Sequence, residues 1–364
     1  MKFRHCLTAV GGVALLGACS SSAPSRTADT TAAAARAART PIVLLAYDSF
    51  VLSKGVLDGF TKATGIPVKL VTQGDAGELV NSAVLTKGDA ESGVLWGVDS
   101  TFLTRAEKED LFVPYESANA ADLEPTLRAL SPKNEVTPVD RGDVCVNFDK
   151  DALTKAGVDA PKSLDDLVDP KYRGMLVVQS PATSSPGLAF LLATIATYGE
   201  DPATGWTSFW TKLAANDVKI VSGWTEAYET WFSAGGGKGD RPLVVSYGTS
   251  PAAAVLFGPD PTATTSPTGV VESTCYRQVE FAGILRGRPD ALDESRELMD
   301  FLTGPLVQDD IQLNMFVYPA NTKVAPAKEF AAFGVKPDTA AELRPDAVDA
   351  GREEWIDAWT EQFG

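Results

Sequence analysis

The sequence predicts an α/β protein in which mixed or parallel sheets are flanked by helices. Three observations indicate this fold class. Short apolar runs alternate with amphipathic stretches, the apolar runs end in polar or aromatic residues, and the chain of 364 residues is long enough for two domains. With 44% hydrophobic and 22% charged residues, the composition is that of a globular body with a sizeable core.

The apolar runs are the predicted strands. In chain order they are Ile42–Ala46, Val68–Val71, Gly93–Trp96, Val144–Phe148, Gly174–Gln179, Val218–Val221, Leu243–Val245 and Val279–Phe281. Stretches with apolar residues three or four positions apart are the predicted helices. They are Leu52–Ala63, Glu78–Thr86, Leu188–Tyr198, Thr204–Asn216, Ala291–Leu302, Gln308–Leu313 and Ala347–Phe363. The strands at Val144–Phe148 and Val279–Phe281 are expected to cross between the two domains.

One stretch places a strand directly before a helix start. Its apolar run ends at Ser246 and Tyr247, after which Ser250 and Pro251 are the expected N-cap and first residue of a helix. Ser185–Pro186 repeats this signal in the same half of the chain. Backbone N–H groups at helix N-termini are unpaired, so the two starts are expected to form a cradle for an anion or polar group. An ordinary strand-to-helix turn is the alternative for each of them.

Aromatic residues follow three of the predicted strands. Tyr47, Trp224 and Tyr247 each lie at or just after a strand end. Open α/β sheets bind ligands at the carboxyl ends of their strands, and ring faces there attract flat or cationic ligands. One such ring is more often rim packing, but three together predict a binding site.

The N-terminus has the pattern of a lipoprotein signal peptide, assigned to residues 1–18. Basic Lys2 and Arg4 precede an apolar run that is too short to span a bilayer. Small residues precede Cys19, which is expected to become the lipidated first residue, with a plain secreted protein as the alternative. Residues 19–40 are expected to be a flexible tether. The body is therefore expected on the outer face of the cell membrane (periplasm or cell surface), held through lipid alone.

Composition excludes several kinds of chemistry. His5, inside the expected signal peptide, is the only histidine in the sequence, which excludes Ser-His-Asp and Cys-His catalysis and histidine metal sites from the mature body. No catalytic residue or metal ligand is predicted. The formal charge is −16, or −18 once Lys2 and Arg4 are removed. Such acidity argues against nucleic acid as a partner and suits a cationic small ligand, with a solvated acidic surface as the commoner alternative.

The four cysteines divide into two groups. Cys6 lies in the expected signal peptide and Cys19 takes the lipid, so Cys145 and Cys275 remain. An even pair in an oxidising location predicts a disulfide between them, with two separate thiols as the alternative. Because both lie in or beside the expected crossing strands, the bond would join the segments that connect the domains.

From Pro41 to its end, the chain resembles the thiamine-binding substrate-binding proteins of ABC importers. The most distinctive matching stretches are Gly223–Tyr228 and Ser246–Ala252. The others are Tyr47–Phe50, Lys69–Val71 with Asp75, Gly97–Asp99, Ser184–Leu188, Gln278–Glu280, Tyr318–Pro319, and Glu354–Ile356 with Trp359. The resemblance implies a type II periplasmic-binding-protein fold, with two α/β lobes closing over a ligand in the cleft between them.

The resemblance also implies a division of the chain. Residues 41–140 with about 278–325 are expected to form lobe 1, residues 141–277 lobe 2, and residues 326–364 C-terminal helices that pack on the lobes. A monomer that delivers its ligand to an ABC transporter permease is expected.

A ligand site is carried over residue by residue. Asp75 and Ala76 match a ligand-contacting turn, and Ser184 and Ser185 match a polar pair that serves hydroxyl or phosphate groups. The remaining implied contacts are Tyr47, Asp99, Trp224, Tyr247, Gly248, Thr249, Ser250, Pro251 and Phe316. The implied ligand is thiamine, thiamine monophosphate or thiamine diphosphate, with no cofactor.

Thiamine carries a cationic thiazolium ring and a flat pyrimidine, which aromatic rings and carboxylates complement. Asp75 is the first choice of charge partner, ahead of Asp48 and Asp99. The chain departs from the family pattern at Ala76, which replaces a glycine. It also departs at Ala253 and Phe316, where another aromatic residue and a tryptophan are expected.

Two other functions stay open. One is a related binding protein for iron(III) or a polyamine, although iron binders of this superfamily use adjacent tyrosines and this chain has no Tyr-Tyr pair. The other is an extracellular glycoside hydrolase that works through a carboxylate pair without histidine. No carboxylate pair is marked by its spacing, so we predict a binding protein and not an enzyme.

Overall fold

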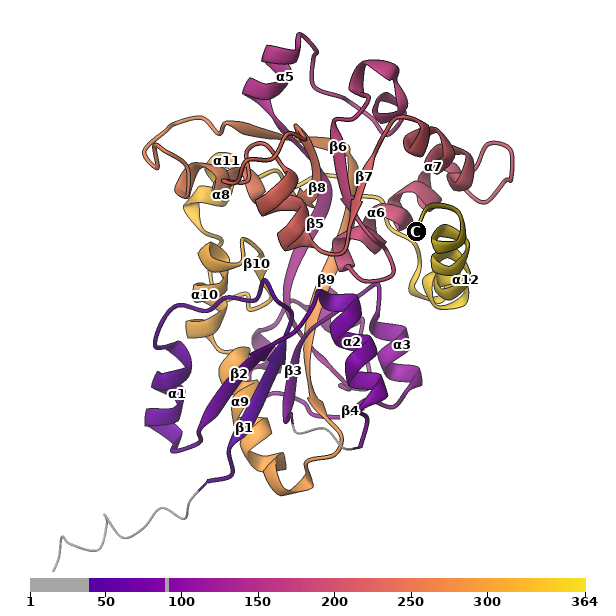
Figure 1. Ribbon diagram of the computed structural model, residues 1–364. Coiled ribbons are helices and arrows are strands. Elements are labelled where there is room, and N and C mark those ends of the chain that lie inside the picture. Colours follow the sequence, from indigo (N-terminus) through magenta and orange to yellow (C-terminus); the bar gives the residue numbers. More distant parts are fainter. Residues whose placement is uncertain (1–38, 89–91) are drawn as a thin grey trace, which may run out of the picture. The chain divides into compact units, whose positions relative to one another are not determined.

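The computed structural model describes residues 39–88 and 92–364. A mixed sheet runs through this part of the chain in the strand order β2-β1-β3-β9-β5-β8-β6-β7, with β10 paired to β5 and β4 paired to β9. Figure 1 shows the sheet with helices on both sides. The expected signal peptide, Cys19 and residues 20–38 of the expected tether lie outside the described residues.

The strands alternate with helices along much of the chain. The strands are β1 (Ile42–Ala46), β2 (Val68–Thr72), β3 (Val94–Asp99), β4 (Phe112–Val113), β5 (Thr137–Asp149), β6 (Leu176–Gln179), β7 (Lys219–Val221), β8 (Leu243–Tyr247), β9 (Thr268–Leu285) and β10 (Tyr318–Pro319). The α-helices are α1 (Val56–Thr64), α2 (Ala76–Leu85), α3 (Leu103–Lys108), α4 (Pro125–Arg128), α5 (Lys150–Ala156), α6 (Ser185–Tyr198), α7 (Trp206–Ala215), α8 (Ser250–Leu256), α9 (Leu292–Leu302), α10 (Pro305–Asn314), α11 (Lys328–Phe333) and α12 (Pro345–Phe363). Short 3₁₀ turns are η1 (Ala120–Asp122), η2 (Asp165–Val168), η3 (Pro170–Tyr172) and η5 (Pro289–Ala291), and η4 (Glu226–Trp231) is a π-helix.

The first lobe is built on β2, β1 and β3, which pair in parallel. Alternate residues of β1 point to opposite faces, as the two-residue period of a strand requires. Leu44 belongs to the core shared with α1, α9 and α10, whereas Leu45 belongs to the core shared with α2 and α3. Both faces of this half of the sheet are therefore covered by helices, which is typical of parallel strands.

The second lobe is built on β8, β6 and β7, where β6 pairs in parallel with both neighbours. Val178 packs on the side of α6 and α7, and Val177 packs on the side of η4. Every residue of α6 from Ser185 to Ile195 is buried. A helix that is apolar on all sides belongs in a protein core, so α6 is the central helix of this lobe.

The two longest strands connect the lobes. β5 and β9 pair antiparallel, and each takes part in both halves of the sheet. They contain the predicted crossing strands, and the expected lobe limits fall inside them. The structure contains the predicted disulfide between Cys145 of β5 and Cys275 of β9. The lobes are thus joined by two covalently linked strands (Figure 1).

The C-terminal segment contacts both lobes. Helix α11 packs on α8 of the second lobe. Helix α12 packs on α3 of the first lobe and α7 of the second. Its Trp359 ring lies 5.3 Å from the ring of Trp210 in α7, at nearly a right angle. Lys108 of α3 forms an ion pair with Asp349 of α12 at 2.9 Å.

The helix starts differ from the prediction by one residue. Ser250 and Ser185 are the first helical residues, with Thr249 and Ser184 as N-caps. Ser250 does not cap α8 because its hydroxyl oxygen accepts a hydrogen bond from the backbone N–H of Tyr247 at 3.1 Å. Its side chain therefore closes the turn that precedes the helix.

The end of the expected tether also differs. Arg39 forms ion pairs with Glu294 at 3.0 Å and with Glu297 at 2.6 Å, both on α9, and Thr40 donates its backbone N–H to Glu294. These two residues are therefore part of the folded body. Within residues 39–88 and 92–364, no helix combines the length and apolar character needed to cross a membrane.

Candidate ligand-binding cleft

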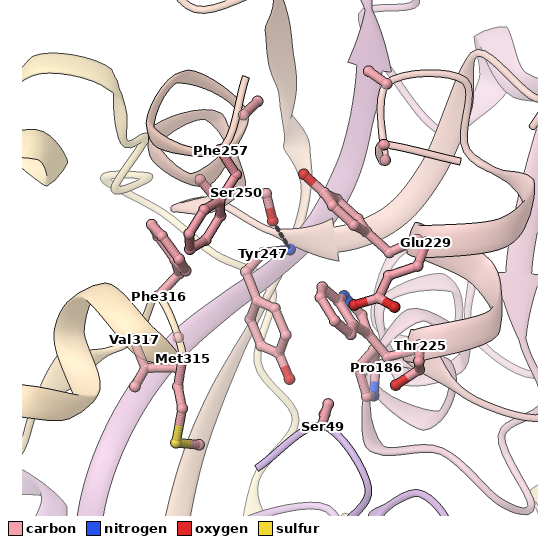
Figure 2. Close-up of a pocket in the computed structure, with 18 of the residues that line it drawn as sticks. Ser49, Pro186, Thr225, Glu229, Tyr247, Ser250, Phe257, Met315, Phe316 and Val317 are labelled. Atoms are coloured by element: carbon pink, nitrogen blue, oxygen red, sulfur yellow. Dashed lines mark hydrogen bonds between the residues drawn. The ribbon is translucent and has the colours of Figure 1, made fainter. Parts of the chain in front are cut away.

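A cavity of about 1310 Å³ lies between the two lobes. Its walls come from the loops after β1 and β2, the starts of α6, η4 and α8, the crossing strands, and the segment before β10. Figure 2 shows Tyr247 in the middle of this space, with Phe257 and Phe316 on one side and Thr225 and Glu229 on the other. This is the carboxyl edge of the parallel strands, where α/β sheets bind ligands.

Tyr247 ends β8 and stands over a crossing strand. A side chain added at Gly142 of β5 would come within 2.9 Å of the Tyr247 ring, so only glycine leaves the ring room to lie against this strand. Burial, together with Glu280 and other nearby acids, raises the pKa of Tyr247 well above its usual range. The phenol is therefore neutral and presents an uncharged ring to the cavity.

Trp224 begins the turn that leads into η4. Its ring stacks on Tyr228 with centroids 4.9 Å apart and planes 14° apart. Its Nε1–H donates to the hydroxyl of Ser246 at 2.9 Å. The stacking on Tyr228 and the hydrogen bond to Ser246 together fix the indole. Trp224 and Tyr228 both line the cavity.

Asp75 precedes α2 and is buried. One oxygen accepts a hydrogen bond from the backbone N–H of Ala76 at 2.6 Å, and the other accepts from the backbone N–H of Trp224 at 2.8 Å. Burial raises the pKa of Asp75 to about 6, although these two N–H groups and Ser184 act to lower it. Asp75 therefore connects the first lobe to the second at one edge of the cleft.

Tyr47, at the end of β1, reaches the floor of the cavity. Its hydroxyl donates to Oε2 of Glu280 at 2.9 Å, and the same oxygen accepts from Nε1–H of Trp96 at 2.8 Å. Burial, with Glu280 and Asp140 nearby, raises the pKa of Tyr47 well above its usual range. Tyr47 thus lines the cavity and donates its hydroxyl to an acid on a crossing strand.

The structure brings most of the predicted site residues together. Those that line the cavity are Tyr47, Asp75, Ala76, Ser185, Trp224, Tyr247, Ser250 and Phe316. Asp48 and Ala253, which the sequence also singles out, line it as well. Phe316 has a φ of 56°, a left-handed conformation uncommon for a bulky residue, and it directs the ring toward Phe257 at 5.6 Å.

Five predicted residues do not line the cavity: Asp99, Ser184, Gly248, Thr249 and Pro251. Asp99 is fully buried at the end of β3, where its Oδ1 accepts hydrogen bonds from the backbone N–H groups of Thr101 and Phe102. Thr249 donates its hydroxyl to the backbone oxygen of Phe316. These two polar groups hold loops in place behind the cavity wall.

Several lining residues were not predicted. The main ones are Asp140, Gly142, Tyr228, Gln278 and Glu280. Gln278 and Glu280 alternate with apolar residues in a buried strand, and that pattern is the sequence signal that places them on one face. Asp140 has no local signal, because only the pairing of β5 with β9 brings it to Glu280.

The cavity is strongly acidic. Its acidic lining residues are Asp48, Asp75, Asp140, Asp149, Asp151, Glu229 and Glu280. Among the described residues that line it, Lys155 is the only basic one. Acids inside a partly enclosed cleft create a negative potential that attracts positively charged ligands. The cavity therefore favours a cation.

The two-lobed α/β fold and its central cleft are those of a solute-binding protein. Residues 94–334 match the family of bacterial extracellular solute-binding proteins, and the chain belongs to this family. This membership confirms the predicted fold class and places the protein outside the cytoplasm. Its relatives bind solutes and are not enzymes, as the sequence predicts.

The similar proteins cover nearly the whole body. The chain is 30% identical over 329 residues to the thiamine-binding periplasmic protein of Salmonella typhimurium, covering 88% of this chain and 93% of the relative. It is 28% identical to the thiamine-binding periplasmic protein of Haemophilus influenzae, over 90% of this chain and 94% of the relative. A solved periplasmic thiamin binding protein superposes with a TM-score of 0.75 at 28% identity, over 88% of this chain and 95% of that one. A ferric binding protein from Campylobacter jejuni, with a TM-score of 0.68 at 16% identity over 88% of this chain and 98% of that one, shares the fold.

Proposed function

We propose that this protein captures thiamine, or one of its phosphate esters, outside the cell and delivers it to the permease of an ABC importer. The observation that carries the proposal is the acidic, aromatic-lined cleft in a chain whose relatives are named as thiamine-binding proteins. No cofactor and no covalent chemistry are involved, and the protein acts as a monomer.

The cleft complements a cationic ring physically. Tyr247 and the stacked pair of Trp224 and Tyr228 offer ring faces, and a cation against an aromatic face gains about 0.5–2 kcal/mol. The acid-rich lining offsets the ligand's positive charge. Ser185 lines the cavity at the N-terminus of α6. Because helix N-termini bind anions and polar groups, this part of the cavity would receive the hydroxyl or phosphate group of the ligand.

Titration calorimetry with the purified protein tests the proposal. Thiamine, thiamine monophosphate, thiamine diphosphate, spermidine and iron(III) citrate are compared at equal concentrations. Saturable binding of at least one thiamine compound at micromolar concentration or tighter is expected, with spermidine and iron(III) citrate at least tenfold weaker. Saturable binding of spermidine or iron alone would replace the thiamine proposal with one of the alternatives.

We also propose that Cys19 carries a lipid that holds the protein on the outer face of the membrane. The support is the small residues that precede Cys19 behind a basic and apolar segment. A Cys19→Ser variant should move from the membrane fraction to the soluble extracytoplasmic fraction. Equal membrane retention of the variant and the natural protein would contradict this.

A further inference from the structure

Two acids face each other on the strands that cross between the lobes. Asp140 of β5 and Glu280 of β9 are direct partners in the antiparallel register. Both line the cavity, yet Asp140 is only 2% exposed and Glu280 only 5%. As cross-strand partners the two acids influence each other's titration, and Glu280 raises the pKa of Asp140. Two buried acids placed opposite each other on neighbouring strands disfavour a second negative charge, so the pair keeps one proton between them.

The surroundings decide which acid carries the charge. Glu280 accepts hydrogen bonds from the hydroxyl of Tyr47 and the indole N–H of Trp96 through Oε2. Asp140 has no such donor, and its Oδ2 has no hydrogen-bond partner among the described residues. Burial raises the pKa of Glu280 to about 7, and burial together with Glu280 raises the pKa of Asp140 well above its usual range. Above about pH 7, the proton therefore belongs on Asp140 and the negative charge on Glu280.

The groups that face this pair from neighbouring elements add no positive charge. Tyr47 reaches it from β1 and Tyr247 from β8, and both are neutral phenols. Asp99 at the end of β3 acts on both acids and disfavours a second negative charge. The adjacent Arg141 is engaged elsewhere, with its guanidinium 5.4 Å from the centre of the Tyr318 ring.

A third polar group lies on the same face of β9. Gln278 is 3% exposed, lines the cavity, and its Oε1 has no hydrogen-bond partner among the described residues. A buried acceptor without a partner is costly unless something donates to it. The cavity floor thus presents two unpaired acceptors, on Asp140 and Gln278, beside the charged Glu280.

We infer that Asp140, Glu280 and Gln278 form the recognition site for the amino-bearing part of a cationic ligand, whose positive charge displaces the shared proton. The proton leaves Asp140 for solvent as the cation arrives, so the net charge of the cavity floor stays constant. The ligand's N–H groups then donate to the acceptors of Asp140 and Gln278. This inference rests on the proposed function, because it assumes a cationic ligand in this cleft.

Calorimetry with thiamine as the probe tests proton displacement directly. Titrations at one pH are repeated in buffers with different ionisation enthalpies, because the difference in heat reports the protons released. Close to one proton per bound thiamine is expected at pH 8, above the pKa of Glu280 of about 7. The Kd should accordingly fall by up to tenfold for each unit increase in pH.

An Asp140→Asn variant supplies the matched test. Its amide can still donate to Glu280, so it imitates the protonated pair, but it holds no proton that the ligand can displace. At pH 8, proton release should be lost and affinity should fall at least tenfold. Asp260→Asn removes an acid that does not line the cavity and should retain natural proton release.

The outcomes separate this inference from the proposed function. Thiamine binding with proton release that disappears in Asp140→Asn supports both. Thiamine binding without proton release overturns the inference and leaves the proposed function standing. If no thiamine compound binds, the proposed function fails. A measurement without ligand then tests whether Asp140 and Glu280 share a proton. The indole N–H of Trp96 donates to Glu280, so its nuclear magnetic resonance signal reports the protonation of Glu280. An indole signal that does not change between pH 5 and pH 9 would overturn proton sharing itself.

Discussion

The carboxylate of Asp75 accepts a hydrogen bond from the backbone N–H of Trp224 at 2.8 Å, which connects the loop after β2 to the turn before η4. Its other oxygen is bound by the N–H of Ala76. Each oxygen of this buried group already has a backbone donor, so Asp75 links the lobes at the edge of the cleft. Glu280 and Asp140 are the acids placed to meet a cation at its floor.

Asp75 should make stability depend on pH. Its pKa is raised from the ordinary 3.8 to about 6 by burial, so the folded state is favoured while Asp75 is protonated. That contribution is complete below about pH 4 and is lost as the pH rises to about 6. Between pH 4 and pH 7, the difference in unfolding free energy between the natural protein and Asp75→Asn should change by roughly 2–3 kcal/mol. Urea unfolding across this range measures it, and parallel profiles for the two proteins would contradict the assignment.

Tyr247 should contribute to binding through its ring. Tyr247→Ala removes a ring face from the middle of the cavity and should weaken thiamine binding by about 1–3 kcal/mol. Tyr247→Phe keeps the ring and should lose much less. Calorimetry on both variants separates ring from hydroxyl, and equal losses in the two would assign the effect to the hydroxyl.

The bond between Cys145 and Cys275 should stabilise the body. It closes a loop with a sequence separation of 130 residues, and removing a native disulfide typically costs about 2–5 kcal/mol. A Cys145→Ala, Cys275→Ala double variant should lose stability in this range in denaturant unfolding without reductant. Intact mass should rise by two hydrogens when the natural protein is reduced and denatured. If no mass change occurs, the two cysteines are separate thiols.

The sequence predicts the features of this fold that depend on neighbouring residues, and it does not predict those that depend on residues far apart in the chain. The strands β1, β2, β3, β6 and β8 are visible as apolar runs because their period is local. The sequence does not show that Asp140 and Glu280 lie together, because they meet only through the long-range pairing of β5 with β9. A polar residue at the end of a strand can either contact a ligand or accept hydrogen bonds from the following loop, and the sequence does not distinguish the two. Asp99 is predicted in the site for this reason, but it binds its own loop and does not line the cavity.

Helix α12 should be needed for the stability of the whole body. Trp359 is 1% exposed and packs on Trp210 of the second lobe, so Trp359→Ala should cost about 3–5 kcal/mol. Asp349→Asn removes only an exposed ion pair with Lys108 and should cost less than about 1 kcal/mol. Urea unfolding of both variants tests this. Similar losses would mean that α12 is held to the body by its charges and not by its aromatic contacts.

Gly77 should control how closely the lobes approach. Its backbone N–H donates to the carbonyl oxygen of Thr183 at 3.0 Å, from α2 of the first lobe to the loop before α6 of the second. A Cβ added at Gly77 would lie 2.7 Å from the backbone of Thr183 and 2.9 Å from the ring of Phe102. Such an overlap forces neighbouring atoms apart and typically costs about 1–3 kcal/mol.

Because the backbone of Thr183 cannot yield as a side-chain tip can, we expect Gly77→Ala to hold the cleft partly open. Thiamine affinity should fall at least tenfold, and small-angle scattering should give a larger radius of gyration for the ligand-saturated variant than for the natural protein. Gly59→Ala is the matched control, since its added Cβ meets nothing within 4 Å inside α1. Alanine there should leave binding unchanged and stabilise the helix by roughly 0.5–1 kcal/mol. If Gly77→Ala binds thiamine as tightly as Gly59→Ala does, the contact between Gly77 and Thr183 does not set how closely the lobes approach.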